Sequence, residues 1–161
     1  MSPPRPGGPA RAIADLIDGL ILARVDVGAS PERVFRALTE GRDVLAWWGS
    51  PDTYRVTEWH SDLRVGGSWR SRGVGVDGAP FEVGGEYLAI DPPFRLVQTW
   101  KAGWDPGAVT TLRYQLDPIA GGTRITVRHE GFAGRAAACE GHADGWERVL
   151  GWLATYLAGG A

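Results

Sequence analysis

Hydrophobic and polar residues alternate along most of the chain, which is the pattern of half-buried β-strands. The first clear example is residues 20–27, whose alternate residues Ile21, Ala23, Val25 and Val27 are apolar. Tight turns containing pairs such as Asp-Gly and Gly-Gly, with no intervening helix, predict an antiparallel meander after residue 54. Its strands are expected at residues 54–60, 68–75, 81–90, 96–100, 109–116 and 123–130.

Three other segments carry helix signals. Ser30 can cap a helix and Pro31 fits the first helical position, which predicts a short helix over residues 31–40. A second short helix is expected at residues 42–47. Residues 132–157 repeat apolar residues at helical spacing. The apolar face of this long helix contains Cys139, His142, Trp146, Val149, Leu150, Leu153, Tyr156 and Leu157.

This order of elements predicts an α+β fold, with helices on one face of an antiparallel sheet. A six- or seven-stranded sheet of this kind twists and curves. The long C-terminal helix would cross its concave face without filling it, which leaves an internal cavity. Residues 1–11 are rich in Pro, Gly and Arg and are expected to form a disordered tail. Residues 12–19 fit either a helical turn or a strand, and residues 12–158 are expected to form one domain.

Composition and charge argue against several classes of protein. The net charge is −2 and no basic block occurs, so nucleic-acid binding is not indicated. The sequence has no run of 18 apolar residues and no apolar signal peptide core, so we expect a cytoplasmic protein without membrane insertion. Cys139 is the only cysteine, which excludes an internal disulfide and a Cys-based zinc site. Neither a metal nor a cofactor is expected, and the protein is expected to be a monomer or a homodimer.

Eight tryptophans are more than a domain of this size needs for packing, and indole rings suit ligand pockets as well as cores. We expect an aromatic lining, suited to a flat apolar or polyaromatic ligand, made by Trp48, Trp69, Tyr87, Trp100, Tyr114, Phe132 and Trp146. Trp104 lies in a Pro/Gly-containing loop and is expected at the cavity entrance. The alternative is a filled core without a ligand.

His129 and His142 are the candidates for chemistry. Strand alternation points His129 into the cavity, and the helix face places His142 opposite it. Two imidazoles there could contact a ligand or act as acid and base. The alternative is that both are hydrogen-bonded interior histidines. No nucleophile motif or carboxylate pair is present, so no catalytic residue is assigned and an enzyme is not favoured.

Six segments occur in one order along the chain: VDVGASPERVFRALTE, LAWWG, DLRVGGSWR, GEYLAIDPPFRLVQTW, GGTRITVRHEGF and HADGWERVLGWLATYL. Together they resemble the SRPBCC (START-like) superfamily, and within it the homologues of the activator of heat-shock-protein-90 ATPase. The resemblance covers about residues 20–157. It implies the helix-grip fold, with a deep cavity between the sheet and the C-terminal helix.

For function, the resemblance implies several possibilities, because relatives include lipid carriers, polyketide cyclases and co-chaperone domains. We expect binding of a hydrophobic or polyaromatic small molecule, for example a polyketide-type metabolite. One alternative is a metal-free cyclase-like enzyme that uses His129 and His142 as acid and base, with Tyr114 or Tyr87 orienting the substrate.

A second alternative also follows from the resemblance, since a similar branch protects producers of enediyne antibiotics by being cleaved in place of other targets. The drug would then abstract hydrogen from a backbone glycine such as Gly67, Gly85 or Gly145.

Overall fold

The computed structural model describes residues 8–159 and places eight strands and three helices in them. The strands are β1 (Arg11–Asp15), β2 (Leu20–Val27), β3 (Tyr54–Ser61), β4 (Ser68–Gly75), β5 (Pro80–Asp91), β6 (Arg95–Ala102), β7 (Thr110–Ile119) and β8 (Gly122–Glu130). The helices are α1 (Pro31–Thr39), α2 (Gly41–Trp47) and α3 (Ala136–Ala158).

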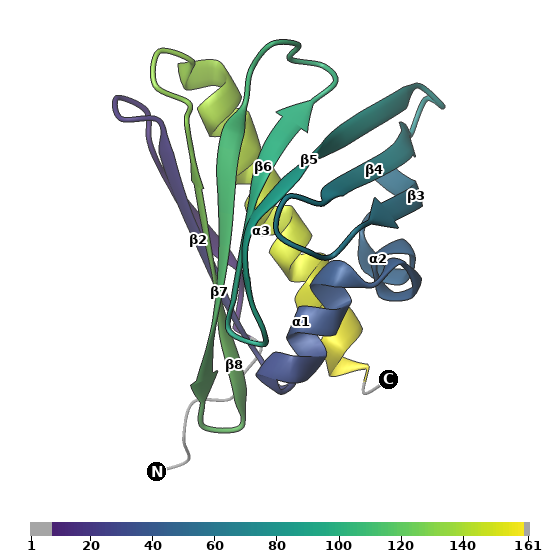
Figure 1. Cartoon of the computed structure of the whole chain (residues 1–161), viewed down its shortest axis with the longest axis vertical. Coiled ribbons are helices and arrows are strands. Elements are labelled where there is room, and N and C mark those ends of the chain that lie inside the picture. The colour runs from purple at the N-terminus through teal and green to yellow at the C-terminus, as the bar shows by residue number, and fades with distance from the viewer. Residues whose placement is uncertain (1–7, 160–161) are drawn as a thin grey trace.

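All strands join one antiparallel sheet in the order β1-β2-β8-β7-β6-β5-β4-β3. Figure 1 shows that β3, β4 and β5 turn away from the layer of β2, β7 and β8, and that α3 runs across the space between them. The predicted α+β helix-grip architecture is confirmed. The sheet has one strand more than the six or seven expected.

The additional strand is β1, which settles the open assignment of residues 12–19. The side chain of Asp15 closes the turn after β1, because its Oδ1 accepts hydrogen bonds of 3.0 Å from the N–H groups of both Ile17 and Asp18. Gly19 then adopts a φ of 69°, which favours glycine. Most of the predicted N-terminal tail, residues 1–7, lies outside the described residues, and β1 already begins at Arg11.

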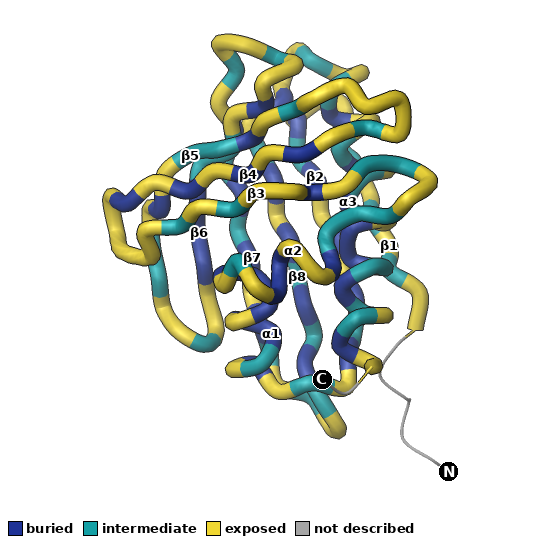
Figure 2. Tube along the Cα trace, turned by 90° about the vertical axis from the view of Figure 1, so that its right-hand side faces the viewer, coloured by how far each residue is buried: buried dark blue, intermediate teal, exposed yellow. Residues whose placement is uncertain are grey.

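Strand alternation predicted the buried face of the central strands correctly. Ile21 on β2, Leu112 on β7 and Val127 on β8 are fully buried. His129 lies in the middle of this face, because it is paired with Ile21 on one side and Leu112 on the other. In Figure 2, buried and exposed segments alternate along the strands in the same way.

The helix signals also worked at the start of α1. Ser30 Oγ accepts a hydrogen bond of 3.2 Å from the Arg33 N–H, and Pro31 occupies the first turn. Gly41 does not simply end this helix, as α1 stops at Thr39 and Gly41 begins α2.

A buried polar cluster joins the three helices. Asp43 on α2 accepts hydrogen bonds from Arg33 on α1 at 2.8 Å and from the Tyr156 hydroxyl on α3 at 2.6 Å. Burial by itself raises the pKa of Asp43, but the hydrogen bonds from Tyr156 and Arg33 outweigh this effect and the pKa is lowered. The cluster therefore holds the short helices against the C-terminal one.

Helix α3 begins at Ala136, four residues later than predicted. Gly131 and Gly134 have φ values of 111° and 78°, which a right-handed helix cannot contain, so Phe132 lies in a loop. The helix packs mainly against β1 and β2. Its opposite side faces β3–β6, and the space left there is the site described next.

Candidate functional site

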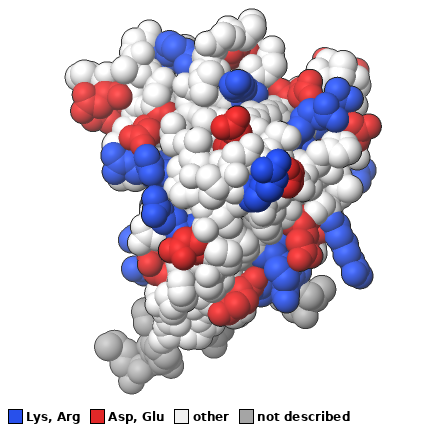
Figure 3. Space-filling view, viewed as in Figure 1, with Lys and Arg blue, Asp and Glu red and all other residues white. Residues whose placement is uncertain are grey.

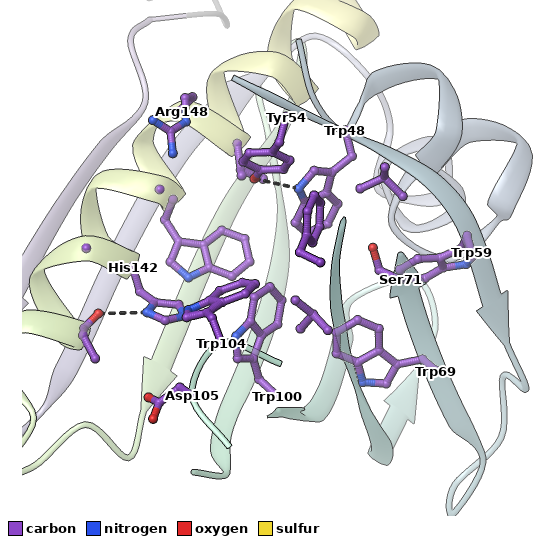
Figure 4. A pocket seen from close by; sticks show the side chains of 18 of the residues that line it. Trp48, Tyr54, Trp59, Trp69, Ser71, Trp100, Trp104, Asp105, His142 and Arg148 are labelled. Carbon is purple, nitrogen blue, oxygen red and sulfur yellow. Dashed lines mark hydrogen bonds between the residues drawn. The ribbon is translucent and has the colours of Figure 1, made fainter. Parts of the chain in front are cut away.

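A cavity of about 650 Å³ lies between α3 and strands β3–β6 (Figure 4). This volume is in the range of small-molecule sites. The sheet side and the β6–β7 loop contribute Tyr54, Val56, Trp59, Trp69, Ser71, Phe81, Val83, Trp100, Trp104 and Asp105. The helical side contributes Trp48, Ala137, Ala138, Gly141, His142, Gly145, Trp146, Arg148 and Val149.

The structure brings several of the predicted ligand contacts together on one wall. Trp48, Trp69, Trp100, His142 and Trp146 all line the cavity. Their indole rings follow one another, with centroids 5.6 Å apart for Trp69 and Trp100, 5.9 Å for Trp100 and Trp146, and 6.2 Å for Trp48 and Trp146. The result is a continuous aromatic surface.

Four other predicted residues, Tyr87, Tyr114, His129 and Phe132, do not line this cavity. All of them are buried in the layer behind its wall. Tyr114 packs edge-on against Trp146, with ring centroids 6.0 Å apart, and Phe132 contacts the back of His142 at 4.9 Å. Sequence alternation placed these side chains on the inner face correctly but gave no information on their depth.

The lining also contains aromatic residues that sequence reasoning missed, namely Tyr54, Trp59 and Phe81. A β-bulge between Val56 and Glu58 shifts the alternation of β3 by one residue. The shift brings Trp59 onto the same face as Val56, although the two residues are an odd number of positions apart. A strict period of two assigns Trp59 to the other face.

Trp104 lies at the mouth, as predicted for an entrance residue. It is 58% exposed and stacks on His142, with ring centroids 6.1 Å apart and planes at 27°. The next residue, Asp105, forms an ion pair with Arg135, which immediately precedes α3. This contact fastens the loop that carries Trp104 to the start of the helix.

Both ring nitrogens of His129 are engaged in a buried chain of hydrogen bonds. An indole N–H only donates, so Trp146 Nε1 donates to His129 Nδ1 over 3.0 Å. The proton therefore sits on Nε2, which lies 2.7 Å from Thr110 Oγ1, and the threonine hydroxyl donates in turn to the Trp100 carbonyl at 3.2 Å. Burial, and to a smaller extent His142, hold the pKa of His129 well below its usual value. This neutral imidazole ties strand β8 to the pocket wall.

His142 is arranged differently. Its Nδ1 lies 2.8 Å from the Ala138 carbonyl, which only accepts, so Nδ1 carries the proton. Nε2 is then a bare acceptor, and it is buried without a partner. Burial lowers the pKa of His142, so the ring is neutral near pH 7. The two histidines are close, with ring centroids 5.5 Å apart, but only His142 lines the cavity.

Two glycines in the middle of α3, Gly141 and Gly145, lie one helical turn apart on the cavity wall. Glycine inside a helix costs about 1 kcal/mol relative to alanine. Packing does not require glycine here, because a Cβ added at either position meets nothing within 4 Å. A side chain at these positions would project into the cavity, so their absence keeps that space open.

The family model described as Activator of Hsp90 ATPase homolog 1-like protein matches residues 28–158, which is most of the chain. The chain belongs to this family. The branch predicted by the sequence resemblance is thereby confirmed, and the helix-grip fold agrees with it.

Solved structures similar to this AHSA1-family chain agree with the assignment. A protein from Rhodobacter sphaeroides is 25% identical, with a TM-score of 0.79, over 92% of this chain and 99% of that chain. The AHSA1 protein from Silicibacter pomeroyi is 26% identical, with a TM-score of 0.75, over 88% of this chain and 99% of that one. CalU16 from Micromonospora echinospora, at 21% identity and a TM-score of 0.67 over 91% and 83% of the two chains, shares the fold. No match was found among curated proteins.

Two further observations concern the described part of this AHSA1-family chain. Residues 8–159 contain no group of three or more His, Cys, Asp or Glu side chains arranged to hold a metal ion. No helix within the same residues has the length and apolar character needed to cross a bilayer. Family membership and the aromatic cavity together indicate a helix-grip protein that binds small molecules.

The buried histidines of this AHSA1-family chain predict acid sensitivity well above the pH at which carboxylates titrate. The unfolded chain takes up a proton on each histidine near the ordinary imidazole pKa of 6.5, whereas His129 in the folded protein stays neutral. Stability is therefore complete above that pH and falls as the pH drops below it. His129 alone should account for a loss of about 1.4 kcal/mol between about pH 7.5 and about pH 5.5.

Urea unfolding at the two pH values measures this loss. Asp26 and Asp43 have lowered pKa values, so their contribution disappears only as the pH falls through and below the ordinary carboxyl pKa of 3.8, outside this window. The same measurement on His129→Asn should give a smaller slope. Equal unfolding free energies at both pH values in the unmodified protein would contradict the neutral buried His129.

Proposed function

We propose that the protein binds a flat, hydrophobic or polyaromatic small molecule, such as a polyketide-type metabolite, in the cavity between α3 and strands β3–β6. The observation that carries this proposal is the continuous indole wall of Trp48, Trp146, Trp100 and Trp69, which faces open space rather than packed side chains. Indole faces favour offset and edge-on contacts with other aromatic rings. A planar ring system matches this wall in shape and polarity.

The glycines of α3 support the same proposal. Gly141 and Gly145 lower the helix propensity of the segment, and no neighbouring atom demands their small size. A core that was merely loosely packed would gain stability from larger side chains at these positions. An open volume lined by aromatic rings is instead what a ligand site requires.

The mouth of the cavity adds one positive charge. The guanidinium of Arg148 lies 6.0 Å from the centroid of the Tyr54 ring and 5.8 Å from that of Trp152. This arrangement places a cation at the rim, where a polar or acidic group of a bound molecule would remain near solvent. Charges of both signs are interspersed on the face seen in Figure 3, so that face does not form a single-sign surface for a polyanion.

Titration of the protein with a panel of polycyclic aromatic compounds tests the proposal. Binding should change the fluorescence of the cavity tryptophans and stabilise the fold, by about 2.7 kcal/mol when the free ligand reaches 100 times its Kd. The Trp48→Phe variant should weaken binding, whereas Trp47→Phe, which alters a buried tryptophan outside the cavity lining, should not. No change in fluorescence or melting temperature across the panel would contradict the proposal.

The alternative functions find less support in the geometry. Acid and base catalysis by two histidines would need His129 to exchange protons with a ligand, but both of its nitrogens are hydrogen-bonded within the wall. For backbone cleavage by a bound drug, Gly145 lines the cavity, whereas Gly67 and Gly85 do not. We therefore retain ligand binding as the proposed function.

A further inference from the structure

One indole donor in the cavity wall differs from its neighbours. Trp100 Nε1 is buried and has no hydrogen-bond partner. Other indole N–H groups of the core and wall are satisfied by protein atoms: Trp47 by the Ala37 carbonyl, Trp48 by the Tyr54 hydroxyl, Trp59 by the Thr39 carbonyl, Trp69 by the Thr99 carbonyl and Trp146 by His129. A buried donor left unpaired costs about 1–3 kcal/mol, so this exception needs an explanation.

The matching acceptor lies next to it. His142 Nε2 is the other buried side-chain polar atom without a partner among residues 8–159. The rings of Trp100 and His142 are nearly perpendicular, at 78°, with centroids 6.1 Å apart. This separation is about twice the ~2.9 Å length of a hydrogen bond, so one oxygen atom between the rings is able to reach both nitrogens. Both residues line the same cavity.

The roles of the two nitrogens are fixed by chemistry. The Trp100 indole only donates. His142 Nε2 accepts, because the proton of the ring is held on Nδ1 by the Ala138 carbonyl. A partner for both atoms must accept one hydrogen bond and donate another through the same atom. A hydroxyl group does this, whereas an ether or a ketone only accepts and a protonated amine only donates.

We propose that Trp100 Nε1 and His142 Nε2 form a recognition site for a phenolic hydroxyl group on the aromatic molecule bound in the cavity. This inference rests on the proposed function, because the aromatic wall must first hold the ring that carries the hydroxyl. The site would select hydroxylated ring systems from bare ones of the same shape. Apolar rings surround it, and a hydrogen bond is stronger in such a low-dielectric environment.

Access to this site depends on Trp104. Neither nitrogen has appreciable contact with solvent, and the half-exposed Trp104 indole stacks on His142. Figure 4 shows Trp100, Trp104 and His142 grouped at one end of the cavity. Trp104 belongs to the short segment between β6 and β7, so a shift of this one ring opens the site without disturbing the sheet.

Three probes of nearly equal shape test the inference: 2-naphthol, 2-methoxynaphthalene and naphthalene. Near neutral pH a phenol keeps its proton, so 2-naphthol both donates and accepts. Transfer from water alone favours the two less polar probes. Two hydrogen bonds at the proposed site should reverse this order, with 2-naphthol binding about tenfold or more tightly than either of the others in fluorescence or calorimetric titrations.

The His142→Phe and Trp100→Phe variants keep an aromatic ring at each position but remove the acceptor or the donor. Each should abolish the preference for 2-naphthol while naphthalene still binds. Trp48→Phe is the matched control: it alters the same wall, but the Trp48 N–H is already paired with Tyr54, so all three affinities should fall alike.

The outcomes separate this inference from the proposed function. Equal binding of the three probes would overturn the hydroxyl site and leave ligand binding intact. Binding of 2-methoxynaphthalene as tightly as 2-naphthol would also overturn it, because His142 would then accept nothing. If none of the three probes nor the wider aromatic panel binds, the proposed function fails. The comparison of the probes on the unmodified protein remains decisive even if a variant does not fold.

Discussion

Replacement of His129 by alanine is expected to lower the free energy of unfolding by about 3–4 kcal/mol. The side chain is fully buried and opposite Ile21 and Leu112 in the middle of the sheet, so its removal leaves a cavity. It also leaves the Trp146 N–H without an acceptor and Thr110 Oγ1 without its imidazole partner. Equilibrium unfolding in urea, followed by tryptophan fluorescence near neutral pH, measures the change.

Two variants show whether the hydrogen-bond chain is responsible. His60 is exposed on β3, and His60→Ala should change stability by less than about 0.5 kcal/mol. Thr110→Val removes the other end of the chain with little change of shape. Its effect should not add to that of His129→Ala in the double variant, since both break the same chain. A cost below about 1 kcal/mol for His129→Ala would show that His129 is not a structural group.

The sequence predicted the fold because the signals for it are periodic. Alternation in residues 20–27 and 123–130 identified the buried face of the sheet, and Ser30 with Pro31 marked the start of α1. What the periodicity did not contain was the edge strand β1. Its hairpin depends on the Asp15 side chain closing a turn, a local hydrogen bond that also suits the first turn of a helix.

The candidate site was predicted less completely, for two physical reasons. Alternation states which face a side chain occupies but not its distance from the cavity, so His129 and Phe132 were grouped with Trp100 although they lie behind the wall. A β-bulge moves every later residue of its strand to the other face, which hid Trp59. The tryptophan excess itself was informative, since composition alone indicated an aromatic volume.

Filling the space beside α3 should abolish ligand binding without harming the fold. The double variant Gly141→Leu/Gly145→Leu introduces two side chains where a Cβ has open space around it. Each leucine raises helix propensity by about 0.8 kcal/mol, so the melting temperature should rise. A ligand would have to displace both side chains, and overpacking of this kind costs about 1–3 kcal/mol per site. The affinity for an aromatic probe such as 2-naphthol should therefore fall by about 100-fold.

Gly151 provides the matched control for this result. It lies in the same helix and also has open space at its Cβ, but it does not line the cavity. Gly151→Leu should raise stability by a similar amount for each site while leaving the affinity unchanged. Unaltered binding in the double variant would place the ligand elsewhere, whereas loss of binding in Gly151→Leu as well would show that helix rigidity, and not the open volume, governs affinity. Only loss confined to the Gly141 and Gly145 substitutions ties these glycines to the ligand, because stability rises in both cases and cannot explain the difference.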